Sequence, residues 1–294
     1  STASATECFG TTVTLTSTLA PNGGAYRWYK DGILLGGEVL RNIDINTVAE
    51  SGNYTVEVTD GSNTATCYST ASTPTTATIN PLPNAGLTVT PNDPSVCDGG
   101  TLTFTVAGSQ AGVNYELFNA TNASFSAPVG GNGGNITITS TAFTTDQTIT
   151  VRATNATTTC TVDLSDTETV TVNPLPTVSL SNNDDGDDTI CNGSTITFTA
   201  GGAATYQFFV NGLSAQGPSA TTTFATAAIA DGDVVSVTGF SAAGCATTSA
   251  GTTITVQDAH ATPTIATASA TECLGTSVTL TASASPNTGD YRWY

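Results

Sequence analysis

The sequence repeats its own beginning near its end, at a constant distance of 265 residues. The string TECFGTTVTLT starts at Thr6, and TECLGTSVTLT starts at Thr271. A second pair, PNGGAYRWY and PNTGDYRWY, ends at Tyr29 and Tyr294, and about two thirds of the overlapping residues are identical. A fixed period of this kind predicts an array of similar structural units. We therefore expect the chain to be a window on a longer array.

A shorter repeat is marked by a pattern that follows four of the seven cysteines. Cysteine, any residue and glycine precede threonines that alternate with aliphatic residues or phenylalanine. Alternation with period two predicts strands that bury one face. The residues expected to face a core are Val13, Leu15, Leu102, Phe104, Ile196, Phe198, Val278 and Leu280.

The chain therefore divides into three units and the start of a fourth. Each unit offers about seven short strands separated by turn residues, and no helical periodicity of useful length, which is typical of an all-β sandwich. We expect the units at residues 1–80 (with an incomplete first strand), 84–173, 177–257 and 262–294.

The seven cysteines predict one disulfide within each complete unit. Read in order, the predicted pairs are Cys8–Cys67, Cys97–Cys160 and Cys191–Cys245, with separations of 59, 63 and 54 residues. Cys273 copies Cys8, so its partner is expected beyond the end of the sequence; the alternative is a free or intermolecular thiol. Disulfides persist in oxidising compartments, which predicts an extracellular location.

The charge balance excludes two classes of partner. Five Lys and Arg stand against 23 Asp and Glu, for a formal net charge of −18. Nucleic acids and anionic membrane surfaces are bound through basic side chains, so neither is an expected partner. No apolar run reaches the roughly 18 residues of a membrane-spanning helix, so no membrane insertion is expected either.

Two motifs carry a resemblance to immunoglobulin-like domains. YRWYKDG, which contains Trp28, resembles strand C, and ESGNY, which ends at Tyr54, resembles the tyrosine corner. The resemblance implies that Trp28, like its copy Trp293, packs in the sandwich centre and that the Tyr54 hydroxyl bonds nearby backbone. Val56 stands where such domains carry their second cysteine. The usual bridge between strands B and F is therefore missing, and a bridge from Cys8 would clamp one end of the sandwich.

Tandem units with these motifs and NPLP joints look like the Ig-like repeats of giant Bacteroidota cell-surface proteins, including gliding-motility adhesins and other substrates of the type IX secretion system. The resemblance implies an extracellular, cell-surface location and an adhesive or fibre-forming role. Pro81 and Pro83 favour an extended backbone between the first two units. We therefore expect an extended rod that advances roughly 40 Å per unit and on the order of 120 Å per period.

The most acidic stretch is a candidate metal site. Asp184, Asp185, Asp187 and Asp188 flank Gly186 and offer the hard oxygen ligands that calcium prefers. The EF-hand spacing is not met. The alternative is a solvated acidic loop, and calcium is the one cofactor that the sequence suggests.

Two further features concern modification and the single histidine. Asp188-Thr189-Ile190 resembles the O-glycosylation pattern of Bacteroidota, which predicts a glycan on Thr189. His260 lies beside Asp258 in a predicted joint. Without a second ligand type nearby, we interpret His260 as an exposed linker residue rather than as a base or metal ligand. Asn-x-Ser/Thr sequons occur at Asn53, Asn119, Asn122, Asn135, Asn155 and Asn192.

The first functional hypothesis is a structural repeat segment of a surface stalk or fibre. Its expected partners are neighbouring repeats, identical chains in a fibre, and surface glycans or proteins as adhesion targets. The alternatives are a glycan- or protein-binding module, in which Tyr29 is an exposed contact residue, and an accessory region of a larger secreted enzyme. Because the acidic residues lie in turns and no insertion builds a cleft, no catalytic residue is predicted.

Overall fold

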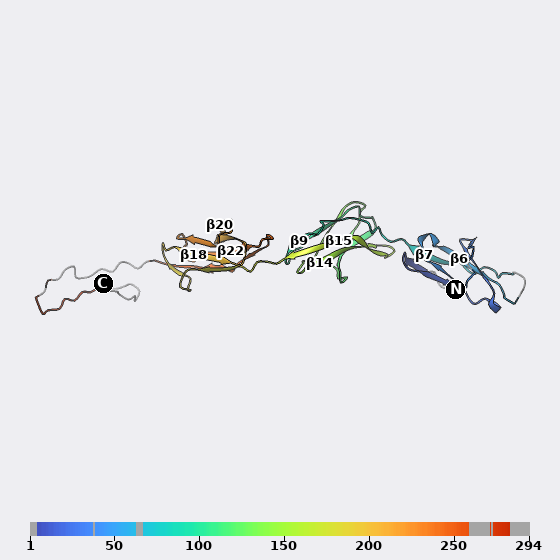
Figure 1. Ribbon diagram of the computed structural model, residues 1–294, viewed down its shortest axis with the longest axis horizontal. Helices are drawn as coiled ribbons and strands as arrows, with labels where there is room; N and C mark the ends of the chain where they lie inside the picture. The colour runs from blue at the N-terminus through green and yellow to red at the C-terminus, as the bar shows by residue number, and fades with distance from the viewer. Residues whose placement is uncertain (1–4, 38, 63–66, 259–270, 272, 283–294) are drawn as a thin grey trace. The chain divides into compact units, whose positions relative to one another are not determined.

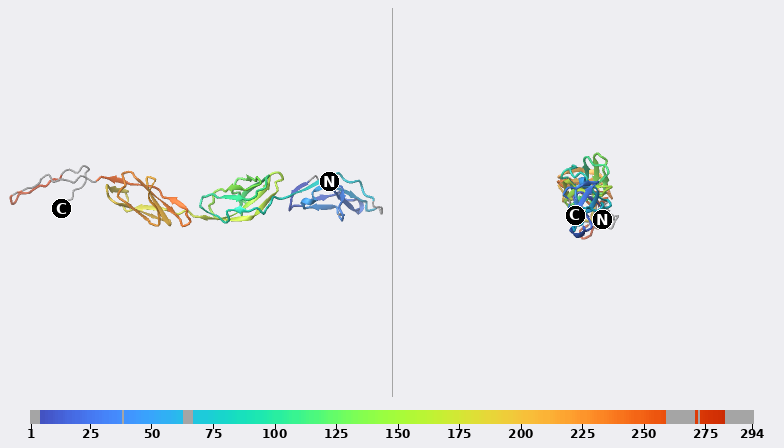
Figure 2. Two further views of the ribbon diagram at one scale, coloured as in Figure 1. Left: turned by 90° about the horizontal axis from the view of Figure 1, so that it is seen from above. Right: turned by 90° about the vertical axis from the view of Figure 1, so that its right-hand side faces the viewer.

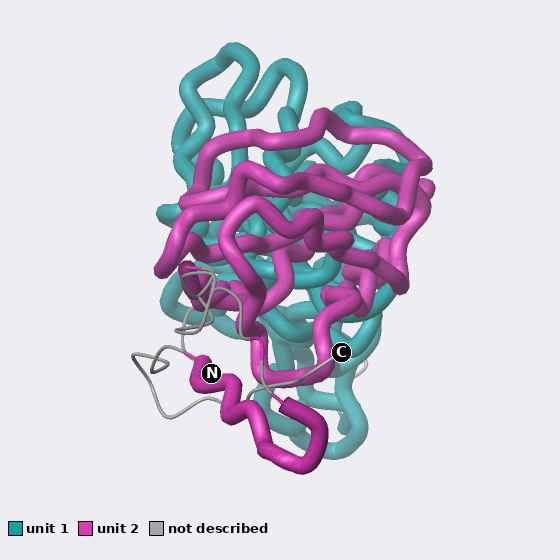
Figure 3. Tube along the Cα trace, turned by 90° about the vertical axis from the view of Figure 1, so that its left-hand side faces the viewer, with its two compact units in different colours: residues 1–172 teal, residues 173–294 magenta. Residues whose placement is uncertain are grey.

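The computed structural model describes residues 5–37, 39–62, 67–258, 271 and 273–282 and consists mainly of β-strands (Figure 1). The chain separates into two compact units, residues 1–172 and 173–294 (Figure 3). Unit 1 holds two sandwiches, which we call domain 1 (residues 5–80) and domain 2 (residues 84–172), and unit 2 holds domain 3 (residues 177–257). The last strand of domain 2 ends at Asn173, the first residue of unit 2. Figure 2 shows the strands of each domain from two further directions. The predicted class, tandem immunoglobulin-like β-sandwich domains, is confirmed.

Domain 1 packs a five-stranded sheet of order β1-β7-β6-β3-β4 against the two-stranded sheet β2-β5. Its strands are β1 (Ala5–Cys8), β2 (Val13–Thr16), β3 (Tyr26–Lys30), β4 (Ile33–Leu34), β5 (Asn42–Ile45), β6 (Gly52–Val58) and β7 (Thr75–Asn80). Short 3₁₀ helices occupy Pro21–Gly23 and Val48–Glu50. β1 runs parallel to β7, with Cys8 opposite Asn80. The first cysteine therefore lies where the last strand of the domain ends.

Domain 2 packs a five-stranded sheet of order β12-β11-β14-β15-β9 against the three-stranded sheet β13-β10-β8. Its strands are β8 (Val89–Thr90), β9 (Ser95–Cys97), β10 (Thr103–Val106), β11 (Val113–Asn119), β12 (Val129–Gly130), β13 (Ile136–Thr139), β14 (Gln147–Asn155) and β15 (Thr161–Asn173). The first strand segment, β8, pairs with β10, and β9 then crosses to the edge of the other sheet beside β15.

Domain 3 repeats this plan with the sheets β20-β19-β22-β23 and β16-β18-β21. Its strands are β16 (Ser179–Asn182), β17 (Thr189–Cys191), β18 (Ile196–Gly201), β19 (Thr205–Val210), β20 (Leu213–Ser219), β21 (Thr223–Thr226), β22 (Val234–Phe240), β23 (Ala246–Thr248), β24 (Thr252–Thr253) and β25 (Thr255–Gln257). β17 runs parallel to β25, with Cys191 opposite Gln257, as Cys8 stands opposite Asn80 in domain 1.

Each domain has its own hydrophobic core, and the alternating strands supply it as predicted. The predicted core positions that are buried, at 0–5% exposure, are Val13, Leu15, Phe104, Ile196 and Phe198. Leu102 is partly buried and packs against the core of domain 2. The period-two pattern therefore identified the buried face of β2, β10 and β18, one strand in each domain.

One set of core predictions is wrong. Val278 and Leu280, the copies of Val13 and Leu15, are 46% and 49% exposed. No second sheet covers them within the part of this region that the structure describes, residues 271 and 273–282. Alternation alone cannot bury a face without an opposing layer.

In the described residues, no helix has the length and apolar character needed to cross a membrane.

Candidate functional site at the joint between domains 1 and 2

The joint between the first two domains is short and tied to both neighbours. On the domain 1 side, the Phe9 amide donates to the Asn80 carbonyl at 2.9 Å. On the domain 2 side, the Asn84 amide donates to Oε1 of Gln110 at 2.6 Å. Pro83, between these two anchors, is buried. The joint is therefore bonded to both domains, and Pro81 and Pro83 restrict its backbone further.

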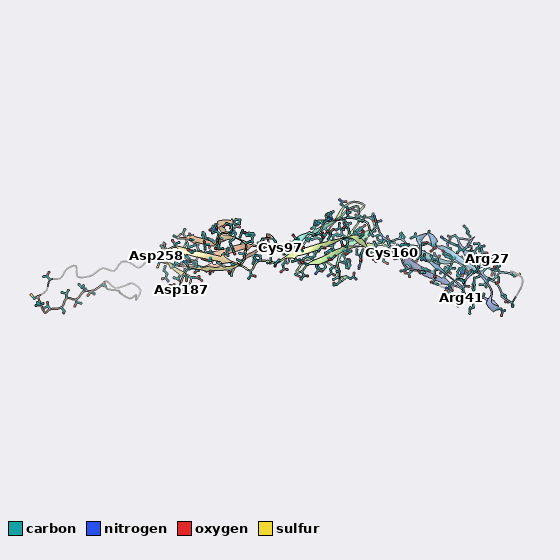
Figure 4. The ribbon with its side chains drawn as sticks, viewed as in Figure 1. Arg27, Arg41, Cys97, Cys160, Asp187 and Asp258 are labelled. Carbon is teal, nitrogen blue, oxygen red and sulfur yellow. A yellow bond between two sulfur atoms is a disulfide. The ribbon has the colours of Figure 1, made fainter. Side chains whose placement is uncertain are left out.

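A disulfide crosses this joint. Cys8, at the end of β1, is bonded to Cys160 with an S–S distance of 1.99 Å and a Cα–Cα distance of 5.5 Å. Cys160 lies in the turn between β14 and β15 and is completely buried; the Asn155 amide donates to its carbonyl at 2.9 Å. Figure 4 labels Cys160 at this end of domain 2. The bond links residues 152 positions apart, in two consecutive domains.

The predicted pairing within domains is wrong, and the strand order explains why. β1 runs parallel to β7, so Cys8 lies at the end of β7, whereas Cys67 precedes its start. Thirteen residues of largely extended chain separate Cys67 from Asn80, which corresponds to roughly 40 Å. Two cysteines more than about 7 Å apart at Cα cannot be bridged. Cys8 and Cys67 therefore lie at opposite ends of the domain.

The same geometry separates the cysteines of the other two domains. In domain 2 the Thr171 amide, near the end of β15, donates to the Pro94 carbonyl. This bond places β9, the strand that follows Pro94 and ends at Cys97, beside the end of β15. Cys160 precedes the start of β15, so the two cysteines lie at opposite ends of the domain. In domain 3 Cys191 stands opposite Gln257. Cys97–Cys160 and Cys191–Cys245 are thus also wrong as predicted pairs.

The remaining cysteines fall into two groups. Cys97 and Cys245 are disulfide-bonded, and the sulfur of Cys245 lies 3.7 Å from the carbonyl oxygen of Asn173, the first residue of the second NPLP segment. Cys67, Cys191 and Cys273 are free and exposed. Each described domain thus carries one cysteine at each end, and none of these domains forms the internal bridge that the sequence predicted.

The tyrosine corner and the core tryptophan are confirmed in domain 1. Trp28 is 3% exposed, and its Nε1 donates to the Leu40 carbonyl at 2.9 Å. Tyr54 is 3% exposed, and its hydroxyl donates to the Glu50 carbonyl. Burial, together with the nearby charges of Glu50 and Asp31, raises the pKa of Tyr54 to about 12. The hydroxyl therefore stays protonated as a donor at neutral pH. Trp293 lies outside the described residues.

Tyr29 is held by its own sheet. Its hydroxyl donates to Oε2 of Glu57 at 2.8 Å, and the same carboxylate lies 3.9 Å from Nη1 of Arg27. The Arg27 guanidinium in turn stacks 3.6 Å from the ring centroid of Tyr68. These contacts engage the polar end of Tyr29, and the predicted role of Tyr29 in binding stays a prediction.

The acidic loop of domain 3 uses its carboxylates locally. Oδ1 of Asp187 accepts the Thr189 amide at 2.9 Å, and Oδ1 of Asp188 accepts from Nδ2 of Asn182 at 2.7 Å. Oδ1 of Asp184 accepts the amide of Gly186. The contacts of Asp184 and Asp187, each to the amide two residues on, are Asx-type turn contacts. No group of three or more His, Cys, Asp or Glu side chains placed to hold a metal occurs among the described residues. Calcium binding here stays a prediction.

Two other predicted sites are Thr189 and His260. Thr189 opens β17, is half-buried, and donates through Oγ1 to the Asp187 carbonyl at 3.3 Å. Its glycosylation stays a prediction. His260 lies outside the described residues, and Asp258 accepts from Nδ2 of Asn192 at 2.9 Å.

Comparison with known proteins gives the following matches. The fibronectin(III)-like modules of Clostridium thermocellum CbhA are 13% identical over 58% of this chain and 94% of theirs, with a TM-score of 0.34. A marsupial T cell receptor is 13% identical over 84% and 97%, with a TM-score of 0.36. An ICAM-5 ectodomain fragment is 12% identical over 86% and 74%, with a TM-score of 0.38. No curated protein matches the sequence. Residues 1–81 match the family model described as "Ig-like domain CHU_C associated", so the first repeat is immunoglobulin-like in sequence as well as in fold.

Proposed function

We propose that this chain is a structural repeat segment of an extracellular filamentous surface protein, a stalk or fibre that serves adhesion or gliding motility. The observation that carries the proposal is the Cys8–Cys160 disulfide, which ties two consecutive domains together across their joint. It supports a role in which the connection between domains itself matters.

The disulfide changes the covalent path that a pulling force follows. A force that enters at β1 reaches Cys8 before any other strand, crosses to Cys160 and leaves through β15. Both hydrophobic cores lie almost entirely outside this path. A stalk built in this way keeps its length under tension, because unfolding of a domain releases little chain. Disulfides are typical of oxidising, extracellular settings, which agrees with a cell-surface location.

The proposed partners follow from the same role. Neighbouring repeats meet at the joints, and identical chains pair laterally in a fibre. The net charge of −18 on the 294-residue chain keeps single chains soluble. Surface glycans or proteins are the proposed adhesion targets of the whole protein. We also propose that the Asp184–Asp188 loop binds calcium and that Thr189 carries a glycan. A calcium-binding titration tests the first of these proposals, and an intact-mass measurement tests the second.

A binding module is the second candidate, and one observation favours it. Domain 1 exposes large apolar side chains around the β3–β4 hairpin and the following loop. They are Ile33, Leu34, Val39 and Leu40, at 73, 50, 61 and 65% exposure. Exposed apolar clusters often mark interaction sites. Tight binding of a defined glycan or protein by isolated domain 1, abolished by Ile33→Asp, would favour this candidate over a purely structural role.

Electron microscopy of the native material tests the structural proposal. A thin beaded thread with roughly 40 Å per domain and a period near 120 Å would support a single-chain stalk. A thicker ordered fibre with lateral contacts would support a fibre built by the domains themselves. Compact particles without a periodic thread or fibre would contradict both forms of the proposal.

A further inference from the structure

The sequence contains one Asp–Pro peptide bond, between Asp93 and Pro94, and the structure places it in the crossover from β8 to β9 of domain 2. The side-chain carboxylate of an aspartate reaches the carbonyl carbon of its own residue through a five-membered ring, so the two groups are already close together. The proline nitrogen carries no hydrogen and leaves as a secondary amine, which takes up a proton readily. A proton donor beside such a bond therefore favours its cleavage.

Strand β15 holds this bond on both sides. The Thr169 amide donates to Oδ1 of Asp93 at 3.1 Å, and the Thr171 amide donates to the Pro94 carbonyl at 3.0 Å. Oε2 of Glu168, on the same strand, accepts the Asp93 amide at 2.8 Å. Asp93 is exposed, so water reaches it from the solvent. The side-chain carboxylate of Asp93 and the peptide bond are thus fixed to β15, with water on the open side.

Glu168 supplies a buried carboxyl group next to this bond. It is 2% exposed, and its Oε1 is buried with no hydrogen-bond partner among the described residues. The charged groups that act on it are Asp166, on its own strand, and Asp93, in the crossover. Burial above all, joined by these two acidic neighbours, raises the pKa of Glu168. The carboxyl group therefore keeps its proton to a higher pH than an ordinary glutamate does.

We propose that domain 2 cleaves its own chain between Asp93 and Pro94, with Asp93 as the nucleophile and Glu168 as the proton donor. Oδ2 of Asp93 attacks the carbonyl carbon of the same residue and forms a cyclic anhydride. The bond from that carbon to the Pro94 nitrogen breaks, and the nitrogen takes the proton of Glu168 with the electron pair of the broken bond. Water then opens the anhydride, which restores the Asp93 side chain and leaves a free α-carboxylate. The net change is the hydrolysis of one peptide bond by one water molecule.

The Cys8–Cys160 disulfide bridges the proposed cut. Cys8 lies on the piece that ends at Asp93, and Cys160 lies on the piece that begins at Pro94. Strand β8 stays on the first piece and pairs with β10 of the second. Cleavage therefore nicks domain 2 without separating the two pieces, which come apart only after reduction and unfolding. The inference does not depend on the proposed function.

Incubation of the oxidised 294-residue chain, followed by mass spectrometry, tests this inference. At about pH 5 we expect the unreduced chain to gain the mass of one water molecule with time. Reduction and unfolding should then release two fragments, residues 1–93 and 94–294, the second with Pro94 as its N-terminal residue. The rate should fall by at least about tenfold between about pH 5 and about pH 8, because Glu168 loses its proton.

Two variants and a matched control separate this reaction from the ordinary acid lability of an Asp–Pro bond. Asp93→Asn should abolish cleavage, and Glu168→Gln should slow it by at least about tenfold at about pH 5. Glu116→Gln, which removes a carboxyl group from β11 of the same domain, should cleave as the unmodified chain does.

Equal rates in Glu168→Gln and the unmodified chain would overturn the inference. So would equal rates in the folded chain and in the chain unfolded by urea, because the fold would then contribute nothing to the reaction. A chain that stays intact through prolonged incubation at about pH 5 would overturn it as well.

Discussion

Reduction of the Cys8–Cys160 bond should greatly lengthen the first two domains under force. The bond joins residues 152 positions apart. An extended chain spans at most about 3.5 Å per residue, so the bond withholds roughly 500 Å of extension. In a fragment of residues 1–172, only the roughly 20 residues at 1–8 and 160–172 lie on the covalent path, which corresponds to about 70 Å when fully stretched.

Single-molecule force spectroscopy measures this difference directly. The fragment is held at Ser1 and Val172, with Cys67→Ser and Cys97→Ser to prevent thiol exchange. The oxidised fragment should reach its limit near 70 Å even after both domains unfold, and the reduced fragment should reach about 600 Å. A variant that adds Cys8→Ser should behave as the reduced fragment does without any reductant.

The same bond should stabilise both domains against denaturants. In the chain-entropy treatment, closing a loop of this length contributes about 5 kcal/mol.

In the force experiment, an oxidised fragment that extends to about 600 Å would refute the reasoning, because Cys8 and Cys160 could not then be joined.

Two further predictions concern single side chains. Tyr54→Phe should lower the free energy of unfolding of domain 1 by about 1 kcal/mol, the usual net contribution of one hydrogen bond, because the bond to the Glu50 carbonyl is lost. Urea denaturation of the single variant measures this loss. An unchanged midpoint would contradict the tyrosine corner. Burial raises the pKa of Glu168, whose Oε1 has no hydrogen-bond partner among the described residues while Oε2 accepts the Asp93 amide at 2.8 Å. Because its folded pKa lies above the unfolded value, the contribution of Glu168 to stability is fully present below the unfolded pKa and is lost as pH rises through the folded pKa. Glu168→Gln should therefore stabilise domain 2 at pH 7 but not near pH 4, as followed by thermal unfolding, and an equal effect at both pH values would contradict the assignment.

Local patterns predicted the strands and the core because they depend on neighbours in sequence. The alternation in VTLT, TFTV and ITFT fixes which side of β2, β10 and β18 is buried. The tyrosine corner joins Tyr54 to Glu50, four residues away. Both features can be identified within a single unit of the repeat.

The disulfide pairing could not be predicted in this way, since it depends on how distant strands pair. Reading the cysteines in order assumed that Cys8 and Cys67 share one end of domain 1. The parallel pairing of β1 with β7 places Cys8 at the opposite end, beside the joint. The position of the first cysteine beside the final strand of its own domain, which leaves its partner in the next domain, becomes known only with the strand pairing.

Peptide mapping without reduction tests the central claim most directly. The native protein is alkylated, digested with a protease that cuts at acidic residues, and analysed by mass spectrometry. We predict a linked peptide pair that contains Cys8 and Cys160, and alkylated Cys67, Cys191 and Cys273 in the 294-residue chain. Linked pairs of Cys8 with Cys67 and of Cys97 with Cys160 would show that the bridges close single domains and would contradict the clamped joint.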